Sequence, residues 1–195
     1  MGRVEPRPIE CGIEVLDESL LARMARAGDG EAFDELLERN LSGIYRLCAG
    51  MLGGGADAED AAQESFVRAF ESLRRYDPSR PFGPWLRGIA VKVCQQCLRK
   101  RSGDLRRTTP LTGREADEVA DEVEPDSPLA DAALEALSGL DENYRLPLTL
   151  FYLGDASVAE VARTLGISPG ATRVRLHRGR EMLREMLHGQ GSDGT

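Results

Sequence analysis

Apolar residues recur at helical spacing along almost the whole of this 195-residue chain, and no stretch alternates as a half-buried strand would. A first short helix is predicted around Leu20, ending at Gly28. A second helix takes Asp29 as its N-cap and is predicted to end at the three glycines of residues 53–55. A third is predicted to begin at Asp57. The N-terminal pattern is therefore purely helical.

Three prolines within residues 76–84 interrupt this pattern, because proline lacks a backbone donor and restricts the residue before it. An extended loop is predicted there, and a fourth helix is expected to begin near Trp85. The four helices together predict one bundle-like domain over residues 18–102, preceded by an extension over residues 1–17.

The periodicity fades over residues 103–128, where acids and prolines accumulate, so this segment is predicted to be a flexible acidic linker. Helical patterning returns for residues 129–188, followed by a tail over residues 189–195 that is predicted to be disordered. The expected fold class is all-α: an N-terminal helix bundle and a C-terminal helix-turn-helix domain, joined by the linker.

Local signals fix the ends of the C-terminal helices. Asp141 is predicted to be an N-cap, and Ser157 with Glu160 is predicted to form a capping box. After a glycine turn, Ser168 is predicted to cap the last helix and Pro169 to occupy its first position. Two helices joined by a short turn, the second rich in arginine, indicate a helix-turn-helix.

Charge is distributed unevenly in this acidic chain of net charge −8. Residues 87–107 hold seven basic residues and one acid, whereas residues 115–142 hold eleven acids and no base. Residues 163–184 hold six arginines against one acid. Local fields decide binding, so a negatively charged partner is expected at the last helix.

A helical projection of the last helix separates an inner face from a basic face. The inner face holds Thr172, Leu176, Gly179, Leu183 and Leu187. The other face holds Arg173, Val174, His177 and Arg178, where arginine can pair with guanine and valine can meet a thymine methyl group. Arg175 and Arg180 flank this face and suit phosphate contacts. The alternative is that the arginines only solvate an exposed helix.

The stretch DAEDAAQESFVRAFESLRRYDPSRPFGPWLRGIAVKV (residues 57–93) resembles region 2 of bacterial RNA polymerase sigma factors of the extracytoplasmic-function (ECF) class. The stretch ALSGLDENYRLPLTLFYLGDASVAEVARTLGISPGATRVRLHRGREML (residues 136–183) resembles region 4 of the same class. The resemblance covers most of the chain and implies an alternative sigma factor, not an enzyme, that directs core polymerase to promoter DNA. It also implies an anti-sigma factor as a partner and no cofactor.

The resemblance assigns roles to particular side chains. Docking on the β′ clamp helices of the polymerase, with the β subunit as a further contact, falls to Asp57, Asp60, Gln63 and Glu64. Alternatively, these acids only favour the helix dipole. Capture of a base flipped from the melting promoter falls to Tyr76, Ser79, Arg80 and Phe82, although Phe82 and Trp85 also suit core anchors, Trp85 in particular. Further contacts to the melted strand fall to Arg87, Lys92, Gln95 and Arg99.

The chain departs from the family pattern at three positions. Lys92 stands where asparagine is common, Cys97 replaces a usual polar or basic residue, and Val174 replaces a common serine. Cys94 and Cys97 make half a zinc site, but the two histidines belong to the other domain, so we expect a core thiol at Cys97 and no metal.

Other classes of protein find little support in the sequence. There is no apolar run long enough to span a bilayer and no secretory signal, so a cytoplasmic protein is expected. The chain has neither a phosphate-binding loop nor a Ser/His/Asp arrangement. A conventional helix-turn-helix regulator that acts without polymerase is the alternative, although it leaves residues 57–64 and the proline loop unexplained.

Overall fold

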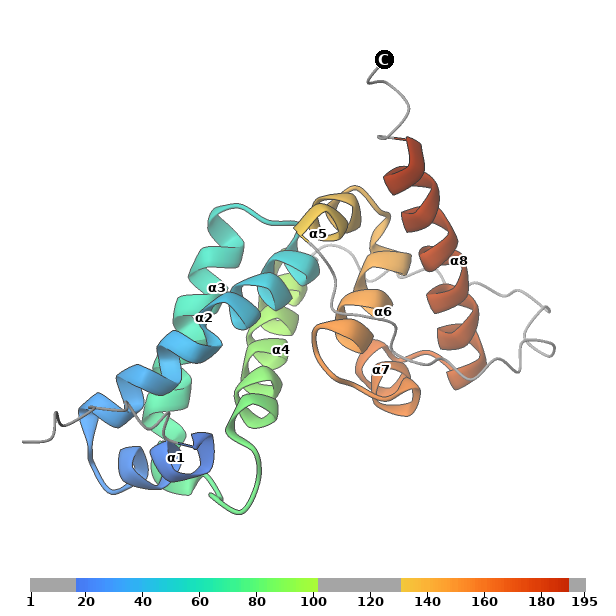
Figure 1. The fold of residues 1–195 in the computed structure, drawn as a ribbon. Helices are drawn as coiled ribbons and strands as arrows, with labels where there is room; N and C mark the ends of the chain where they lie inside the picture. The colour runs from blue at the N-terminus through green and yellow to red at the C-terminus, as the bar shows by residue number, and fades with distance from the viewer. Residues whose placement is uncertain (1–16, 102–130, 190–195) are drawn as a thin grey trace, which may run out of the picture.

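The computed structural model describes residues 17–101 and 131–189, which we call the N-terminal half and the C-terminal half. Over these residues the chain is helical and contains no strand (Figure 1). The predicted linker, most of the N-terminal extension and nearly all of the tail lie outside the described residues. The N-terminal helices are α1 (Glu18–Arg26), α2 (Gly30–Leu52), α3 (Ala56–Ser72), the 3₁₀ turn η1 (Leu73–Arg75) and α4 (Phe82–Arg101). The C-terminal helices are α5 (Asp131–Ser138), α6 (Glu142–Tyr152), α7 (Val158–Leu165) and α8 (Pro169–Gly189).

Helix α2 forms the centre of the N-terminal half, where it packs against α1, α3 and α4. Its ends follow the sequence signals. The Asp29 carboxylate accepts a hydrogen bond from the Ala32 amide at 3.1 Å, and Gly53 ends the helix with φ of 89°, a left-handed conformation that suits glycine. The largest fully buried side chains in this core are Leu36, Ile44, Leu47, Met51, Phe82 and Leu86.

In the C-terminal half, α8 packs against α5, α6 and α7. The predicted capping box is confirmed, since the Ser157 amide donates to Glu160 at 2.9 Å and the Glu160 amide donates to the Ser157 hydroxyl at 3.3 Å. The Ala171 amide donates to the Ser168 hydroxyl at 3.1 Å, which confirms that cap too. Helices α7 and α8 are therefore the predicted helix-turn-helix, with Gly166 left-handed at the turn.

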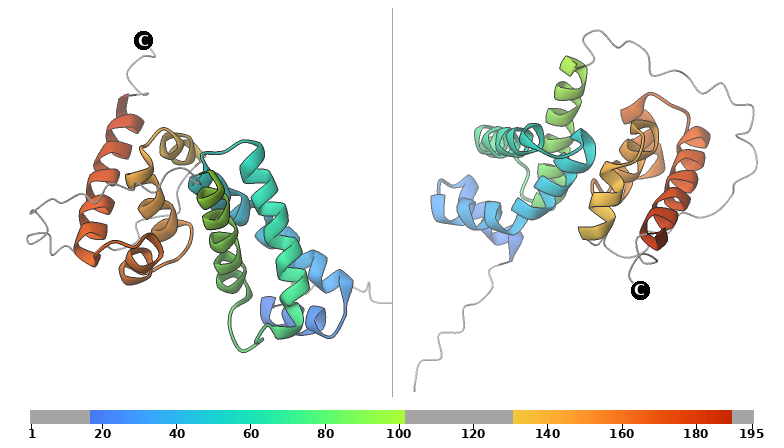
Figure 2. Two further views of the ribbon diagram at one scale, coloured as in Figure 1. Left: turned by 180° about the vertical axis from the view of Figure 1, so that it is seen from behind. Right: turned by 90° about the horizontal axis from the view of Figure 1, so that it is seen from above.

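The two halves pack directly against one another. Helix α2 contacts both α5 and α6, and Figure 2 shows the halves side by side from two directions. Leu146, Leu150 and Val161 of the C-terminal half join the core of the N-terminal half. The expected all-α architecture of two helical units is confirmed, and the structure adds an apolar interface between them that the sequence does not reveal.

Several local predictions are wrong. Helix α4 begins at Phe82 and not near Trp85, because the first turn of a helix has no internal partner for its amides and so accepts Pro84. The helical spacing groups Phe70 with Ala62, Phe66 and Ala69 on one side of α3, but Phe70 is 63% exposed. Leu187, expected on the inner face of the last helix, is 37% exposed.

Candidate nucleic-acid and protein-docking surfaces

The loop before α4 is held by aromatic packing. The Tyr76 ring lies 4.7 Å from the Trp85 ring and 5.6 Å from the Phe82 ring, measured between centroids. The Tyr76 hydroxyl donates a hydrogen bond to the Arg80 carbonyl, and burial raises the pKa of Tyr76. Tyr76 and Phe82 are 2% and 1% exposed, so the expectation that they line an open rim is wrong. They anchor the loop from beneath.

The tip of the same loop is polar and exposed. The Asp77 carboxylate accepts hydrogen bonds from the Ser79 hydroxyl at 2.8 Å and the Ser79 amide at 3.0 Å, and these bonds lower the pKa of Asp77. Arg80 extends outward with its side chain 79% exposed and its Nε 3.8 Å from the Asp77 carboxylate. Of the side chains predicted to capture a base, the structure presents Ser79 and Arg80 to solvent.

The predicted DNA face of α4 is divided. Lys92 and Arg99 are exposed. Arg87 is half-buried and ion-paired with Asp155 of the loop between α6 and α7, while the Gln95 side-chain amide donates to the Thr164 carbonyl at 3.4 Å. The C-terminal half thus occupies two of the four side chains that the sequence assigns to the melted strand.

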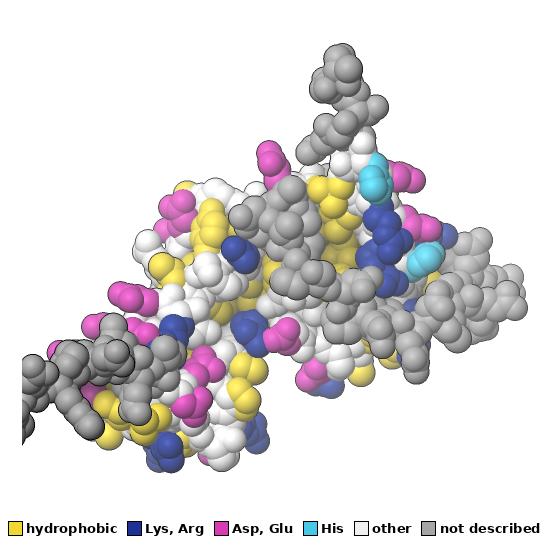
Figure 3. Space-filling view, in the orientation of Figure 1, with side chains coloured by type: hydrophobic (Ala, Val, Ile, Leu, Met, Phe, Trp, Pro, Cys, Tyr) yellow, Lys and Arg dark blue, Asp and Glu magenta, His cyan; other side chains and the backbone are white. Residues whose placement is uncertain are grey.

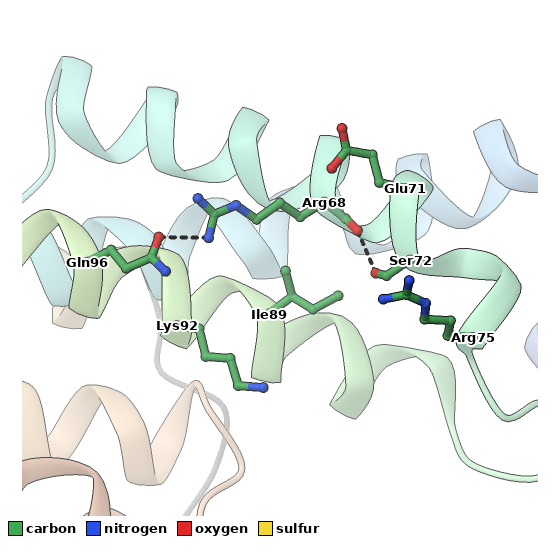
Figure 4. Close-up of a pocket in the computed structure, with 7 residues that line it drawn as sticks. All are labelled: Arg68, Glu71, Ser72, Arg75, Ile89, Lys92 and Gln96. Atoms are coloured by element: carbon green, nitrogen blue, oxygen red, sulfur yellow. Dashed lines mark hydrogen bonds between the residues drawn. The ribbon is translucent and has the colours of Figure 1, made fainter.

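A groove between α3 and α4 extends this face (Figure 4). Arg68 crosses it, donating to Gln96 at 2.8 Å and to Glu64 at 2.6 Å. The groove is lined by Arg68, Glu71, Ser72, Arg75, Ile89, Lys92 and Gln96. Three cations against one acid make the groove basic, a site that suits a phosphate. Sequence reasoning missed Arg68 and Arg75, although the pair Arg74-Arg75 directly before the proline loop was a signal.

On α8, basic side chains gather beside the histidines (Figure 3). Arg173 and Arg178 are exposed, and Val174 and His177 are half-buried on the same side. Arg175 is only 7% exposed and its Nε has no hydrogen-bond partner, so its predicted position on the outer surface is wrong. Its side chain lies against the packed side of the helix, which the helical projection alone does not reveal.

The start of α3 presents an acidic and amide-bearing surface. Asp57, Asp60, Gln63 and Glu64 are all exposed; Asp57 is ion-paired with Arg101 at the end of α4, and Glu64 with Arg68. Val67 and Phe70 continue the same side of the helix and are 52% and 63% exposed. We call the set Asp60, Gln63, Glu64, Val67 and Phe70 the α3 face. The sequence analysis did not assign its two apolar members to a docking surface.

Comparisons with known proteins agree with this geometry. Sigma-70 region 2 matches residues 36–103, and Sigma-70, region 4 matches residues 130–183. The chain is 33% identical over 175 residues to the ECF RNA polymerase sigma factor SigW of Bacillus subtilis (strain 168), covering 85% of this chain and 94% of that one. The chain belongs to the ECF class of RNA polymerase sigma factors.

A second relative supports the assignment, and a solved structure shows the same fold. The chain is 36% identical over 163 residues to the RNA polymerase sigma factor CarQ of Myxococcus xanthus, covering 83% of this chain and 92% of that one. A solved structure of CnrH, a sigma factor of Cupriavidus metallidurans, matches with a TM-score of 0.53 at 23% identity, over 88% of this chain and 97% of that one. This ECF sigma factor is an alternative sigma factor. The alternative hypothesis, a conventional helix-turn-helix regulator that acts without polymerase, is not favoured.

Among the described residues of this ECF sigma factor, the cysteines lie in the core or beside it. Cys48 and Cys94 are fully buried, and Cys97, for which a core thiol was expected, is half-buried. A hydrogen bond with Cys48, together with burial, raises the pKa of the Cys94 thiol. The buried thiol is therefore Cys94, and its neighbour is Cys48 of α2, which the sequence does not indicate. Within residues 17–101 and 131–189, no helix is long and apolar enough to cross a bilayer.

Proposed function

We propose that this ECF sigma factor docks on core RNA polymerase through the α3 face, engages the melted promoter strand with the α4 face and its neighbouring loop, and reads the upstream promoter element with α8. The observation that carries the proposal is the composition of the α3 face. Exposed acids and an amide at its start are followed by two large exposed apolar side chains on the same side.

Such a face suits a protein partner better than solvent. An exposed Phe70, with its ring 5.3 Å from that of Phe33, is expected at a docking surface, because large exposed apolar groups seldom cluster without a partner. Asp60 and Glu64 supply charge complementarity to a basic partner helix, which mainly favours the rate and the specificity of association. Asp57 and Glu64 are also ion-paired within the chain, with Arg101 and Arg68 respectively, and both stay exposed.

The nucleic-acid surfaces are basic and lie apart from the α3 docking acids along the chain. Single-stranded DNA is bound by cations that follow its backbone and by polar or aromatic groups that receive bases. Arg80, Lys92 and Arg99 are exposed and match the first requirement, and the exposed Ser79 matches the second, while Tyr76, Phe82 and Trp85 keep the loop rigid. On α8, Arg173 and Arg178 project toward solvent, as base-reading side chains must.

Two finer points follow from this proposal. The protein acts through binding and not as an enzyme, and it works in the cytoplasm, where the polymerase is. A solved relative, CnrH, was determined in complex with the cytosolic domain of CnrY. Another sigma factor, RpoE of Bartonella quintana, was determined in complex with the anti-sigma factor NepR, and we propose that an anti-sigma factor binds this chain too.

Charge reversal tests the docking surface. The double variant Asp60→Lys, Glu64→Lys should weaken binding to core polymerase by about tenfold or more, because like charges then oppose each other at the interface. Glu38→Lys, a reversal of another exposed acid on α2, is the matched control. Affinity is measured by pull-down with purified core polymerase, and circular dichroism checks helical content. Unchanged binding of the double variant would refute the docking assignment.

A further inference from the structure

Arg68 of α3 holds the side-chain amide of Gln96 across the groove between α3 and α4. The Arg68 Nη1 donates a hydrogen bond to the Gln96 Oε1 at 2.8 Å, and the Arg68 Nε donates to the Glu64 carboxylate at 2.6 Å. The guanidinium is rigid and planar, so two bonds from different nitrogens fix its plane as well as its position. Arg68 is therefore a fixed hydrogen-bond donor at the side of the groove.

This contact decides which way round the Gln96 amide lies. A glutamine amide has an oxygen that accepts and a nitrogen that donates, and the two exchange places when the amide turns over. Arginine has donors and no acceptor, so only the amide oxygen can face Arg68. Figure 4 shows this oxygen turned toward Arg68 and the nitrogen away from it. Gln96 is exposed and lines the groove, so it offers its two N–H donors to a group that enters there.

The amide of Gln96 lies among cations that suit phosphates. Lys92 precedes Gln96 by one turn of α4, and Arg75 lines the other end of the groove (Figure 4). Contacts to phosphates position a nucleic acid but do not distinguish its bases, whereas an amide can bond to a base edge. The neighbouring Gln95 already donates to the Thr164 carbonyl. Gln96 thus adds to the groove a contact that is able to distinguish bases.

We propose that Arg68 is a positioning residue that fixes the Gln96 amide, so that Gln96 selects bases with a keto oxygen in the melted promoter strand. The inference rests on the proposed role of α4 in binding that strand. Guanine and thymine carry a keto oxygen, which accepts from the amide nitrogen, where adenine and cytosine carry an amino group. An amino group would meet the fixed amide donor against donor, and unpaired donors at a contact are costly. A free glutamine avoids this cost by turning over, and Arg68 prevents that turn.

Selection of DNA fragments by holoenzyme tests the inference. The probe is a library of duplex fragments with a randomised upstream element and a randomised unpaired segment, and the fragments that wild-type and variant holoenzyme bind are sequenced. Wild type should prefer guanine or thymine over adenine or cytosine at one unpaired position by about fivefold, as expected for one hydrogen bond made or lost. Arg68→Met removes the donor that faces Gln96. That preference should then fall to about equal, because the amide is free to turn over.

Further variants separate orientation from charge and from folding. Gln96→Glu should invert the preference at the same position toward adenine and cytosine, because a carboxylate only accepts, whereas Gln96→Ala should abolish the preference. Arg68→Lys keeps a donor and no acceptor toward Gln96, so it should retain the wild-type preference. Arg75→Met is the matched control for the lost charge, since Arg75 lines the same groove. It should weaken binding of all fragments alike and leave the preference unchanged.

Two results would overturn the inference. One is a Gln96→Ala holoenzyme that keeps the wild-type preference at every unpaired position, and the other is an Arg68→Met holoenzyme that keeps it. Thermal unfolding checks that the Arg68→Met protein folds. If it does not, Arg68→Gln replaces it, because a glutamine at position 68 stays polar and can accept as well as donate, so it no longer fixes the Gln96 amide.

Lys92→Glu separates failure of this inference from failure of the proposed function. If that charge reversal leaves binding to the unpaired fragments unchanged, the role of α4 itself is refuted. If it weakens binding while the variants of Gln96 and Arg68 keep the wild-type preference, α4 binds the strand and only the selection of keto bases is wrong.

Discussion

The hydroxyl of Tyr76 donates a hydrogen bond to the carbonyl of Arg80, four residues further along the same loop. This bond closes the loop on itself while the Tyr76 ring packs against Trp85 beneath it. The loop is therefore rigid at its base and presents Arg80 at its tip. A rigid loop with an exposed polar tip can receive a flipped base without first ordering itself.

Because of this arrangement, a substitution at the tip of the loop and one at its base should have different effects. Arg80→Ala should leave stability nearly unchanged, because its side chain is 79% exposed, but should slow promoter melting by holoenzyme. Tyr76→Ala should instead lower the free energy of unfolding by about 3–5 kcal/mol, as expected for removing a buried aromatic ring. Permanganate footprinting measures melting, and urea denaturation measures stability. An unchanged footprint for Arg80→Ala would exclude the loop from base capture.

The groove between α3 and α4 allows a test by salt dependence. If Arg75 and Lys92 each hold a phosphate of the melted strand, replacing either by alanine should lower the slope of log affinity against log salt by about 0.7. The measurement is holoenzyme binding to a pre-melted promoter fragment over a range of salt. Arg74→Ala is the control, since Arg74 is exposed on η1 but does not line the groove. An equal change of slope in the Arg74 control would mean that the groove has no special role in binding phosphates of the melted strand.

Features set by neighbouring residues were predictable from the sequence. The caps at Asp29, Ser157 and Ser168 each depend on a side chain reaching an amide three residues away, so the short pattern suffices. The glycines that end α2 likewise carry their own conformational signal. The all-α class followed from periodicity, and the family followed from two extended motifs in the right order.

Features set by distant residues were not predictable. Tyr76 is buried because the rings of Trp85 and Phe82 pack against its ring. The spacing of these residues along the chain does not predict that contact. The burial of Arg175 was not predictable from a helical projection. A projection places only the start of a side chain, and a long side chain can lie over its neighbours. Gly50 lies at a close contact with Thr149, but Gly43 of the same helix has nothing within 4 Å of an added Cβ atom, so a glycine inside a helical pattern does not by itself predict close packing.

The capping box of α7 should be sensitive to pH. Backbone and side-chain hydrogen bonds from Ser157 lower the pKa of Glu160, so its contribution to stability is present above the carboxyl group's ordinary pKa. That contribution is lost as the pH falls through the lowered value. Ser157→Ala should cost about 1 kcal/mol at neutral pH and less in acid, measured by thermal unfolding.

Ser168→Ala provides the comparison for the capping box. Ser168 caps α8 by accepting from the Ala171 amide, and no carboxylate completes that cap. The cost of removing it should therefore stay the same from neutral to acidic pH. If the two serine variants show the same pH dependence, the Glu160 carboxylate does not contribute through the box.

Replacing single arginines of α8 by alanine should have three different effects, depending on the position. Arg173 and Arg178 are exposed toward the surface that would meet the major groove, so losing either should cost about 1–3 kcal/mol and relax preference at one promoter position. Arg180→Ala should weaken binding to all promoter sequences alike, and it should lower the slope of log affinity against log salt concentration by about one unit. Arg175→Ala should mainly reduce stability, because that side chain is 7% exposed.

The experiment is transcription from a library with a randomised upstream element, by holoenzyme carrying each variant, at low and high salt. Thermal unfolding of the four free variants runs beside it. If all four variants lose transcription equally for every upstream sequence, α8 binds DNA through its charge alone and does not recognise the sequence. A fully stable Arg175→Ala protein with a lowered salt slope would show that the buried side chain swings out to a phosphate. We expect selective losses for Arg173 and Arg178, because only base-edge contacts distinguish one promoter position from another.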